Sequence, residues 1–176
     1  THPCESRCRR GSVDEAMNIC ELKRFATDWA YAQGFPYDED LKPQADIDKR
    51  VAIIGAGPSG LTCGYYLARL GYHVDIYEAE RRAGGVMTYG IPDYRLPLNI
   101  LEREIGTIER AGVNIILNTK IGVDVSFRSL QKNYDAIFIA IGAQKTLRLG
   151  IPGEDLEGVY HGLDFLKRHF LKHDLD

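Results

Sequence analysis

The sequence predicts an α/β fold built on a parallel sheet, with an α-helical extension before it. After residue 50, short apolar runs alternate with segments of helical character, the order that gives a parallel sheet with crossover helices. A glycine-rich turn joins the first apolar run to a helix. The first 49 residues are more polar and hold three of the four cysteines. We therefore predict an extension over residues 1–49 and an α/β part over residues 50–176.

The composition is that of an ordinary globular protein and argues against several classes of partner. Hydrophobic residues make up 44% of the chain and the formal net charge is −3, without a basic patch that would favour nucleic acid or an anionic membrane surface. No apolar run approaches the roughly 20 residues of a membrane helix, and the polar N-terminus lacks the pattern of a signal peptide. We expect a cytoplasmic protein, and the start at Thr1 indicates a fragment or a processed product.

The extension is predicted to contain one helix. Ile19, Leu22, Phe25 and Trp29 recur at three- and four-residue steps, the spacing of one helical face. Gly34 is typical of a helix end. The acidic segment over residues 35–46 carries two prolines and is typical of a linker.

The α/β part is predicted to alternate strands with helices. Strands are expected over residues 50–54, 73–77, 113–117 and 135–141. The first helix is expected over residues 58–70, with Gly71 ending it. A second, amphipathic helix is expected to end at Gly112. Its apolar face is marked by Leu98, Leu101, Ile105 and Ile108, which recur at helical spacing. A polar helix over residues 167–176 completes the prediction.

The glycine-rich turn Gly55-Ala56-Gly57-Pro58-Ser59-Gly60 carries the strongest functional signal. It follows a predicted strand and opens a helix, as the dinucleotide-binding turn of a Rossmann fold does. The first glycine permits the tight turn, the second lets the backbone approach a pyrophosphate, and the third allows close packing of helix on strand. The free amides and the positive end of the helix dipole would then face the phosphates.

Glu78 supplies the acidic partner that such a turn requires. It ends the second predicted strand, about 20 residues beyond the turn. An acid at this place accepts hydrogen bonds from the adenosine ribose and repels a 2′-phosphate, which favours FAD or NAD over NADP. The alternative is a glycine turn followed by an incidental glutamate.

The pair Gly84-Gly85 favours FAD over NAD. A glycine pair allows close backbone approach to a ligand, and a long ligand that runs past the ribose toward a bulky ring would need that clearance. The pair could also be an ordinary loop turn. A plain NAD-binding dehydrogenase domain therefore stays open as a weaker alternative.

Several segments resemble the small subunit of glutamate synthase, and the related flavin region of dihydropyrimidine dehydrogenase is similar. The matching segments are residues 51–60, 77–78, 84–85, 89–97, 140–143, 151–156 and 158–160. The resemblance implies an NADPH-dependent flavin oxidoreductase that passes electrons between NADPH, FAD and iron–sulfur clusters and on to a partner subunit or domain. It implies that this chain holds the front half of the FAD-binding Rossmann domain, with the NADPH site outside this chain.

The resemblance also implies a set of cofactor-binding residues, and the sequence itself shows no nucleophile–base pairing that would indicate a catalytic side chain. The implied FAD contacts are Gly55, Ala56, Gly57, Pro58, Ser59, Gly60, Glu78, Gly84, Gly85, Val86, Arg95, Ile121, Ala140 and Gly142. Within this set the glycine turn would hold the pyrophosphate, Ile121 would meet the adenine, and Ala140 and Gly142 would close over the dinucleotide. Arg95 would add a cationic contact, although by itself it could equally be a solvated charge.

The N-terminal cysteines have two readings. Cys4 and Cys8 form a C-x₃-C pair, which by spacing alone is either part of a metal site or two unrelated loop thiols. The resemblance implies that both are ligands of a 4Fe-4S cluster whose remaining ligands lie outside this chain. The fourth ligand stays open, because the matching place near Lys23 holds a poor ligand. Cys20 is a substitute candidate that we expect to be a packed thiol, and Cys63 is expected to be structural.

Two functions of different class follow from these features. The first is the FAD-binding portion of an NADPH-dependent oxidoreductase of the glutamate synthase small-subunit type, with FAD doing the redox chemistry. The second is a non-catalytic cofactor-holding or scaffold module of a larger electron-transfer complex, docked through the helix around Trp29.

Overall fold

The structure is a computed structural model that describes residues 2–36 and 38–172. The chain divides into two compact units, Thr1–Asp40 and Leu41–Asp176, which are treated separately below. Residues 41–46 pack within the second unit, because Leu41 is buried and the Gln44 amide donates to Arg69 O at 2.8 Å. The short helix α3 (Asp38–Leu41) lies at the boundary between the units along the chain.

The first unit is a helical segment. It contains α1 (Pro3–Ser6), the 3₁₀ turn η1 (Arg9–Ser12) and α2 (Ile19–Ala32). The amide of Cys20 donates to Glu5 Oε1 at 2.8 Å and so joins the start of α2 to α1. The helix predicted from the apolar spacing is therefore confirmed, and Gly34 follows it with φ +80°. Its apolar stripe is exposed within the unit, since Phe25 and Trp29 keep 70% and 61% of their surface.

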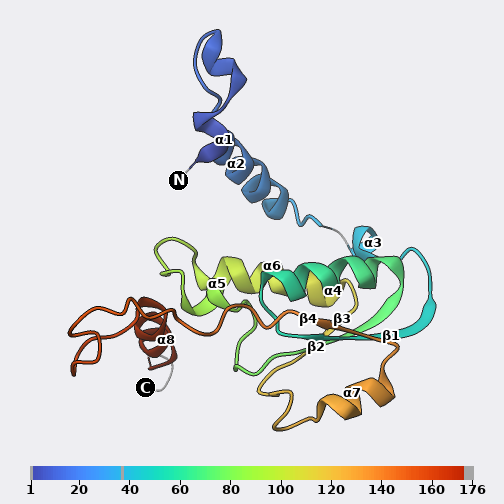
Figure 1. Ribbon diagram of the computed structural model, residues 1–176. Helices are drawn as coiled ribbons and strands as arrows, with labels where there is room; N and C mark the ends of the chain where they lie inside the picture. The colour runs from blue at the N-terminus through green and yellow to red at the C-terminus, as the bar shows by residue number, and fades with distance from the viewer. Residues whose placement is uncertain (1, 37, 173–176) are drawn as a thin grey trace. The chain divides into compact units, whose positions relative to one another are not determined.

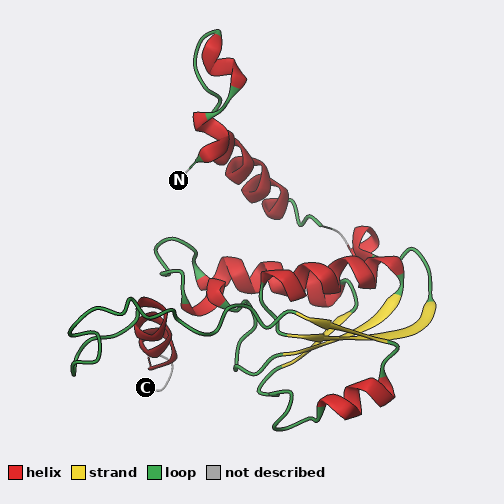
Figure 2. Cartoon of the chain, in the orientation of Figure 1, coloured by secondary structure: helices red, strands yellow, loops and turns green. Residues whose placement is uncertain are grey.

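The second unit is built on a four-stranded parallel sheet, which confirms the predicted fold class (Figures 1 and 2). The strands are β1 (Ile47–Ile54), β2 (Tyr72–Tyr77), β3 (Val113–Ile116) and β4 (Ala136–Ile139). Their order is β3-β2-β1-β4, so β1 lies in the interior with a parallel neighbour on each side. The carboxyl end of β1, where the glycine turn begins, is therefore flanked by the ends of β2 and β4.

Helices cover the two faces of this sheet unequally. The helices α4 (Pro58–Leu70) and α6 (Leu98–Arg110) lie on one face, and α7 (Phe127–Asn133) lies on the other (Figure 2). The short helix α5 (Val86–Tyr89) precedes α6, and α8 (Gly162–Lys172) lies beside α5 (Figure 1). None of the helices in the described part of the chain has the length and apolar character to cross a bilayer.

Three helical predictions have different outcomes. The helices expected over residues 58–70 and before Gly112 are confirmed as α4 and α6. The last helix, expected over residues 167–176, begins earlier at Gly162, and residues 173–176 lie outside the described residues. The helix α7 was not predicted. Its signal was Ser126, whose side-chain oxygen accepts from the Ser129 amide at 3.1 Å as a helix N-cap does.

The core lies between the sheet and α4. The side chains of Val51, Ile53, Val74, Ile76 and Val113 meet Leu61 and Ala68 there. Gly64 lets α4 approach closely, because a Cβ at this residue would come within 2.9 Å of Ile76 Cδ1. Cys63 packs against the same cluster and burial raises the pKa of its thiol, as expected for a structural cysteine.

A polar network crosses the other face of the sheet. Asp75 accepts from Asn114 Nδ2 at 2.6 Å, from the Tyr134 hydroxyl at 2.7 Å and from Arg50 at 3.1 Å. The hydroxyls of Tyr134 and Tyr77 lie 2.8 Å apart. Burial opposes ionisation of Asp75, but the hydrogen bonds outweigh it and lower the pKa of this carboxyl. The network ties the residue that follows α7 to β1, β2 and β3.

Candidate functional site

The glycine turn at the end of β1 is held by backbone contacts that require glycine. Gly55 has φ +104°, and its amide donates to Tyr77 O at 2.8 Å. A Cβ on Gly55 would come 2.5 Å from Ala140 O, and a Cβ on Gly60 would come 1.9 Å from Gly55 O. The first and third glycines of the motif therefore have the structural roles that the sequence predicts.

Gly57 differs, because nothing in the protein requires glycine there. Its backbone is extended, with φ −78° and ψ −178°, and a Cβ would meet no atom within 4 Å. Gly57 is also the N-cap of α4, where no side chain caps the helix. The open space over this residue is the feature expected where a ligand, rather than the fold, excludes a side chain.

The N-terminus of α4 presents backbone amides to that space. The first helical hydrogen bond is donated by Leu61 to Gly57 O at 2.9 Å. The amides of Ser59 and Gly60 precede it and belong to the orphan donors of the first turn. With the positive end of the helix dipole, they form a site suited to an anion.

Glu78 is a buried charged side chain beside the turn, with 9% of its surface exposed. Its Oε2 accepts from the Ala56 amide at 2.8 Å and its Oε1 accepts from the Glu80 amide at 2.9 Å. The two bonds fix the carboxylate against the glycine turn, and each oxygen retains a lone pair for a further donor. The acid and the turn are thus brought together as predicted.

The glycine pair Gly84-Gly85 also contacts the glycine turn. The Gly84 amide donates to Ala56 O at 2.7 Å. Gly85 has φ +56°, and a Cβ there would approach Gly57 Cα to 3.0 Å. Val86 follows as the first residue of α5, with 42% of its surface exposed. The pair is therefore a close backbone approach to the turn and more than an isolated loop bend.

Three further predicted residues reach the same edge of the sheet. The Ala140 amide donates to Ile54 O at 2.8 Å, and Gly142 follows with φ +67°. Ile121 lies two residues after Thr119, whose amide donates to Glu78 O at 2.8 Å. Ile121 also bridges Val125 in the turn beyond.

Arg95 is a predicted residue that the described contacts do not bring to the turn. Its amide donates to Pro92 O at 2.8 Å, and its guanidinium lies 5.9 Å from the centre of the Tyr94 ring. Both contacts are within the loop between α5 and α6. The cationic role of Arg95 stays a prediction.

The cysteines of the first unit form no disulfide and are partly accessible. Cys4 and Cys20 are exposed and Cys8 is half-buried. The prediction that Cys20 is packed is wrong, because α2 turns this position outward within its unit. Hydrogen bonds from the backbone of Met17 and Arg10 lower the pKa of the Cys8 thiol. Among residues 2–36 and 38–172, no three His, Cys, Asp or Glu side chains gather as a metal site.

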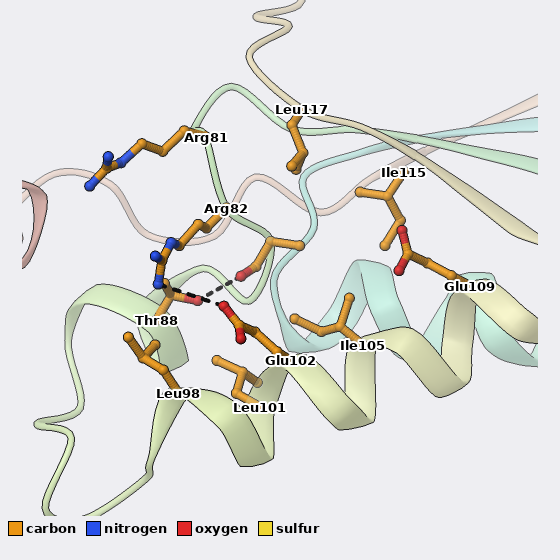
Figure 3. A pocket seen from close by; sticks show the side chains of 11 residues that line it. Arg81, Arg82, Thr88, Leu98, Leu101, Glu102, Ile105, Glu109, Ile115 and Leu117 are labelled. Carbon is orange, nitrogen blue, oxygen red and sulfur yellow. Dashed lines mark hydrogen bonds and ion pairs between the residues drawn. The ribbon is translucent and has the colours of Figure 1, made fainter. Parts of the chain in front are cut away.

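A cavity that the sequence did not predict lies between α6, the end of β3 and the loop after Glu78. It has a volume of about 220 Å³. Apolar side chains line it, among them Leu101, Ile105 and Ile115, and charged side chains stand at its edge (Figure 3). Arg82 pairs with Glu102 across this edge at 3.7 Å. Because the edge carries charges of both signs, the cavity favours neither an anionic nor a cationic ligand.

The sequence also does not predict the ion pair between Lys167 and Glu80, which joins α8 to the loop that carries Gly84 and Gly85. Lys167 Nζ on α8 is 2.5 Å from Glu80 Oε1. The two residues are 87 positions apart, and no local pattern in the sequence couples them.

Comparison with known proteins places this geometry in a family. Residues 49–171 match the family described as Pyridine nucleotide-disulphide oxidoreductase. The chain belongs to this family. The match covers β2, β3, β4 and β1 from residue 49 onward, together with the glycine turn, in agreement with the Rossmann-like architecture.

Relatives of the family extend this assignment. The chain is 44% identical to the NADPH-Fe(3+) oxidoreductase subunit beta of Geobacter sulfurreducens, over 97% of this chain and 26% of the relative. It is 38% identical to the glutamate synthase [NADPH] small chain of Halomonas elongata, over 93% of this chain and 34% of the relative. The predicted resemblance to the glutamate synthase small subunit is confirmed. The chain spans about a quarter to a third of these relatives.

A solved structure agrees with the fold. FprA of Mycobacterium tuberculosis in complex with NADPH matches with a TM-score of 0.62 and 28% identity. The match covers 70% of this chain and 30% of FprA.

Proposed function

We propose that the α/β unit binds the ADP half of FAD at the glycine turn. The observation that carries this proposal is the open space over Gly57, at an uncapped helix N-terminus and beside a fixed carboxylate. A pyrophosphate there would accept from the amides of Ser59 and Gly60, and the adenosine ribose would donate to Glu78. The residues present therefore fit a dinucleotide.

The choice of FAD over NAD rests on the glycine pair and on the family. The Gly84 amide bonds Ala56 O and Gly85 approaches Gly57, and such a close backbone approach suits a ligand that continues past the ribose and pyrophosphate. We propose the complete set of predicted contacts from Gly55 to Gly142, with Arg95 the least supported member. When bound, FAD would supply hydride and electron transfer, and the residues of this chain would bind and orient it.

For the whole protein we propose an NADPH-dependent flavin oxidoreductase. The names of its relatives support NADPH as the electron donor, and the designation of one relative as a subunit supports a partner subunit. The names of these relatives indicate different overall reactions. The cytoplasmic location expected from the nucleotide-binding motif stays a prediction.

The iron–sulfur role does not fit the described residues by themselves. Cys4 and Cys8 stay candidates for part of a ligand set, and Cys8 has hydrogen bonds that favour its thiolate. Among residues 2–36 and 38–172, no three possible ligands gather at one place, so these residues by themselves do not form a cluster site.

Ligand titration tests the proposed site. The protein would be freed of bound flavin and titrated with FAD, FMN, NAD and ADP, with fluorescence and calorimetry as readouts. We expect FAD to bind more tightly than NAD, ADP to compete with FAD, and FMN to bind weakly because it lacks the adenosine and the second phosphate. Binding of FMN as tight as that of FAD would contradict an ADP-gripping site, and tighter binding of NAD would favour the plain dehydrogenase alternative.

A turnover assay separates the enzyme from the scaffold module. The exposed apolar stripe of α2, with Phe25 and Trp29, favours a docking role for the first unit. NADPH-dependent reduction of a dye by the complete protein is expected if the chain belongs to an active oxidoreductase. Absence of turnover together with stoichiometric FAD would favour the non-catalytic module.

A further inference from the structure

We propose that Lys167 on α8 is a positioning residue for the dinucleotide site, because it holds the segment over residues 79–90 against the glycine turn. The proposal rests on the proposed FAD binding, which it deepens by adding a residue that does not touch the cofactor. Lys167 acts through Glu80, which links the C-terminal helix to the proposed ribose acid Glu78.

Contacts from α8 converge on one side of this segment. Lys167 Nζ lies 2.5 Å from Glu80 Oε1 and 5.1 Å from the centre of the Tyr89 ring. Leu163 Cδ2 lies 3.5 Å from the place that a Cβ on Gly90 would occupy. The helix therefore contacts both ends of the segment, and Figure 1 shows α8 beside α5.

The opposite side of the segment forms the proposed cofactor cradle. The Glu80 amide donates to Glu78 Oε1 at 2.9 Å and the Gly84 amide donates to Ala56 O at 2.7 Å. A single residue, Glu80, therefore orients the ribose acid with its backbone and bonds Lys167 with its side chain. If Glu80 moved, the carboxylate of Glu78 would lose its fixed position. The Gly84 amide would also shift relative to Ala56 O in the turn.

The environment of Lys167 favours a persistent bond. The side chains of Lys167 and Glu80 each keep about a third of their surface, at 32% and 33%, so solvent screens the pair less than it screens a fully exposed one. The hydrogen bond to Glu80 raises the pKa of Lys167 against the opposing effect of burial. The next cation on the helix, Arg168, instead lies over the Tyr160 ring at 5.0 Å.

Matched variants of the complete chain test the inference. Lys167→Ala is expected to weaken FAD affinity about fivefold, from loss of one partly buried ion pair that orders the cradle. Lys167→Arg is expected to stay within about twofold of the wild type, because a guanidinium can also bond Glu80. Arg168→Ala removes a cation one residue away and is expected to leave FAD affinity unchanged.

A charge exchange distinguishes positioning from simple stabilisation. Glu80→Gln is expected to weaken FAD binding as Lys167→Ala does, and the combination of the two is expected to add nothing further. The exchange variant K167E/E80K is expected to recover part of the affinity. Thermal unfolding of every variant without FAD separates lost stability from lost binding.

Each outcome bears on one proposal. If the wild type does not bind FAD, the proposed function fails before the variants are compared. If the wild type binds FAD and Lys167→Ala binds it equally well, the positioning role is overturned. The role is also overturned if Arg168→Ala weakens binding as much, or if neither Lys167→Arg nor the exchange variant recovers affinity.

Discussion

Replacing Gly57 by alanine separates the needs of the fold from the needs of the ligand. The extended backbone of Gly57, with φ −78° and ψ −178°, is accessible to alanine. The added methyl group would meet no protein atom within 4 Å. It would instead occupy the space over the first turn of α4, where the pyrophosphate is proposed to lie.

The expected magnitudes for stability and binding differ widely. Loss of glycine flexibility in the unfolded chain stabilises by about 0.4–1 kcal/mol, whereas alanine is a poorer N-cap than glycine by on the order of 0.5–1 kcal/mol. The free energy of unfolding should thus change by less than about 1 kcal/mol. Displacing the phosphate from one charge-assisted hydrogen bond costs about 1.5–3 kcal/mol, which raises the FAD dissociation constant about 10- to 150-fold.

Gly106→Ala is the matched control. Gly106 lies inside α6, and a Cβ there also meets nothing within 4 Å. Alanine should stabilise this helix by about 1 kcal/mol and leave FAD affinity unchanged. Calorimetric titration with FAD and urea unfolding of the ligand-free protein measure the two effects. Wild-type FAD affinity in Gly57→Ala, or an equal loss of affinity in Gly106→Ala, would refute the placement of the pyrophosphate.

Three other substitutions test the frame of the site. Gly60→Ala would set a Cβ 1.9 Å from Gly55 O, and we expect a loss of about 3 kcal/mol or more in urea unfolding; a loss under about 1 kcal/mol would mean that the turn is less tight than described. Glu78→Gln exchanges one of two oxygen acceptors for a donor, so one amide of the pair at Ala56 and Glu80 loses its partner, at a cost of about 1–3 kcal/mol. The same variant should also bind FAD more weakly, and unchanged FAD affinity would exclude Glu78 as the ribose acceptor. Asp75 has a lowered pKa, so its contribution to stability is present above its unfolded pKa of about 3.9 and is lost as pH falls through the lower folded value. Asp75→Asn should therefore flatten the fall in unfolding free energy between about pH 5 and pH 2, and an unchanged slope would assign the acid sensitivity to other carboxylates.

Local patterns determined most of the fold class and the centre of the site. The alternation of apolar runs and helices predicted a parallel sheet because each pattern reflects the repeat of its own element. The role of Gly60 could be assigned because its constraint comes from Gly55 O, five residues earlier, whereas the Cβ clash at Gly55 is with Ala140 O and the role of Gly55 was inferred from the motif alone. The start of α7 also had a local signal, because Ser126 is a residue type that favours the N-cap position and caps this helix in the structure.

Contacts between distant residues could not be obtained in this way. The sequence by itself determined that this chain carries a dinucleotide turn followed by an acid. Only the tertiary structure decided that Glu78 turns both oxygens inward and that Gly85 lies against Gly57. It also decided that Lys167 reaches Glu80 across 87 residues. The physical reason is that side-chain direction and long-range pairing depend on how strands and helices pack, and a one-dimensional pattern specifies the elements without their neighbours.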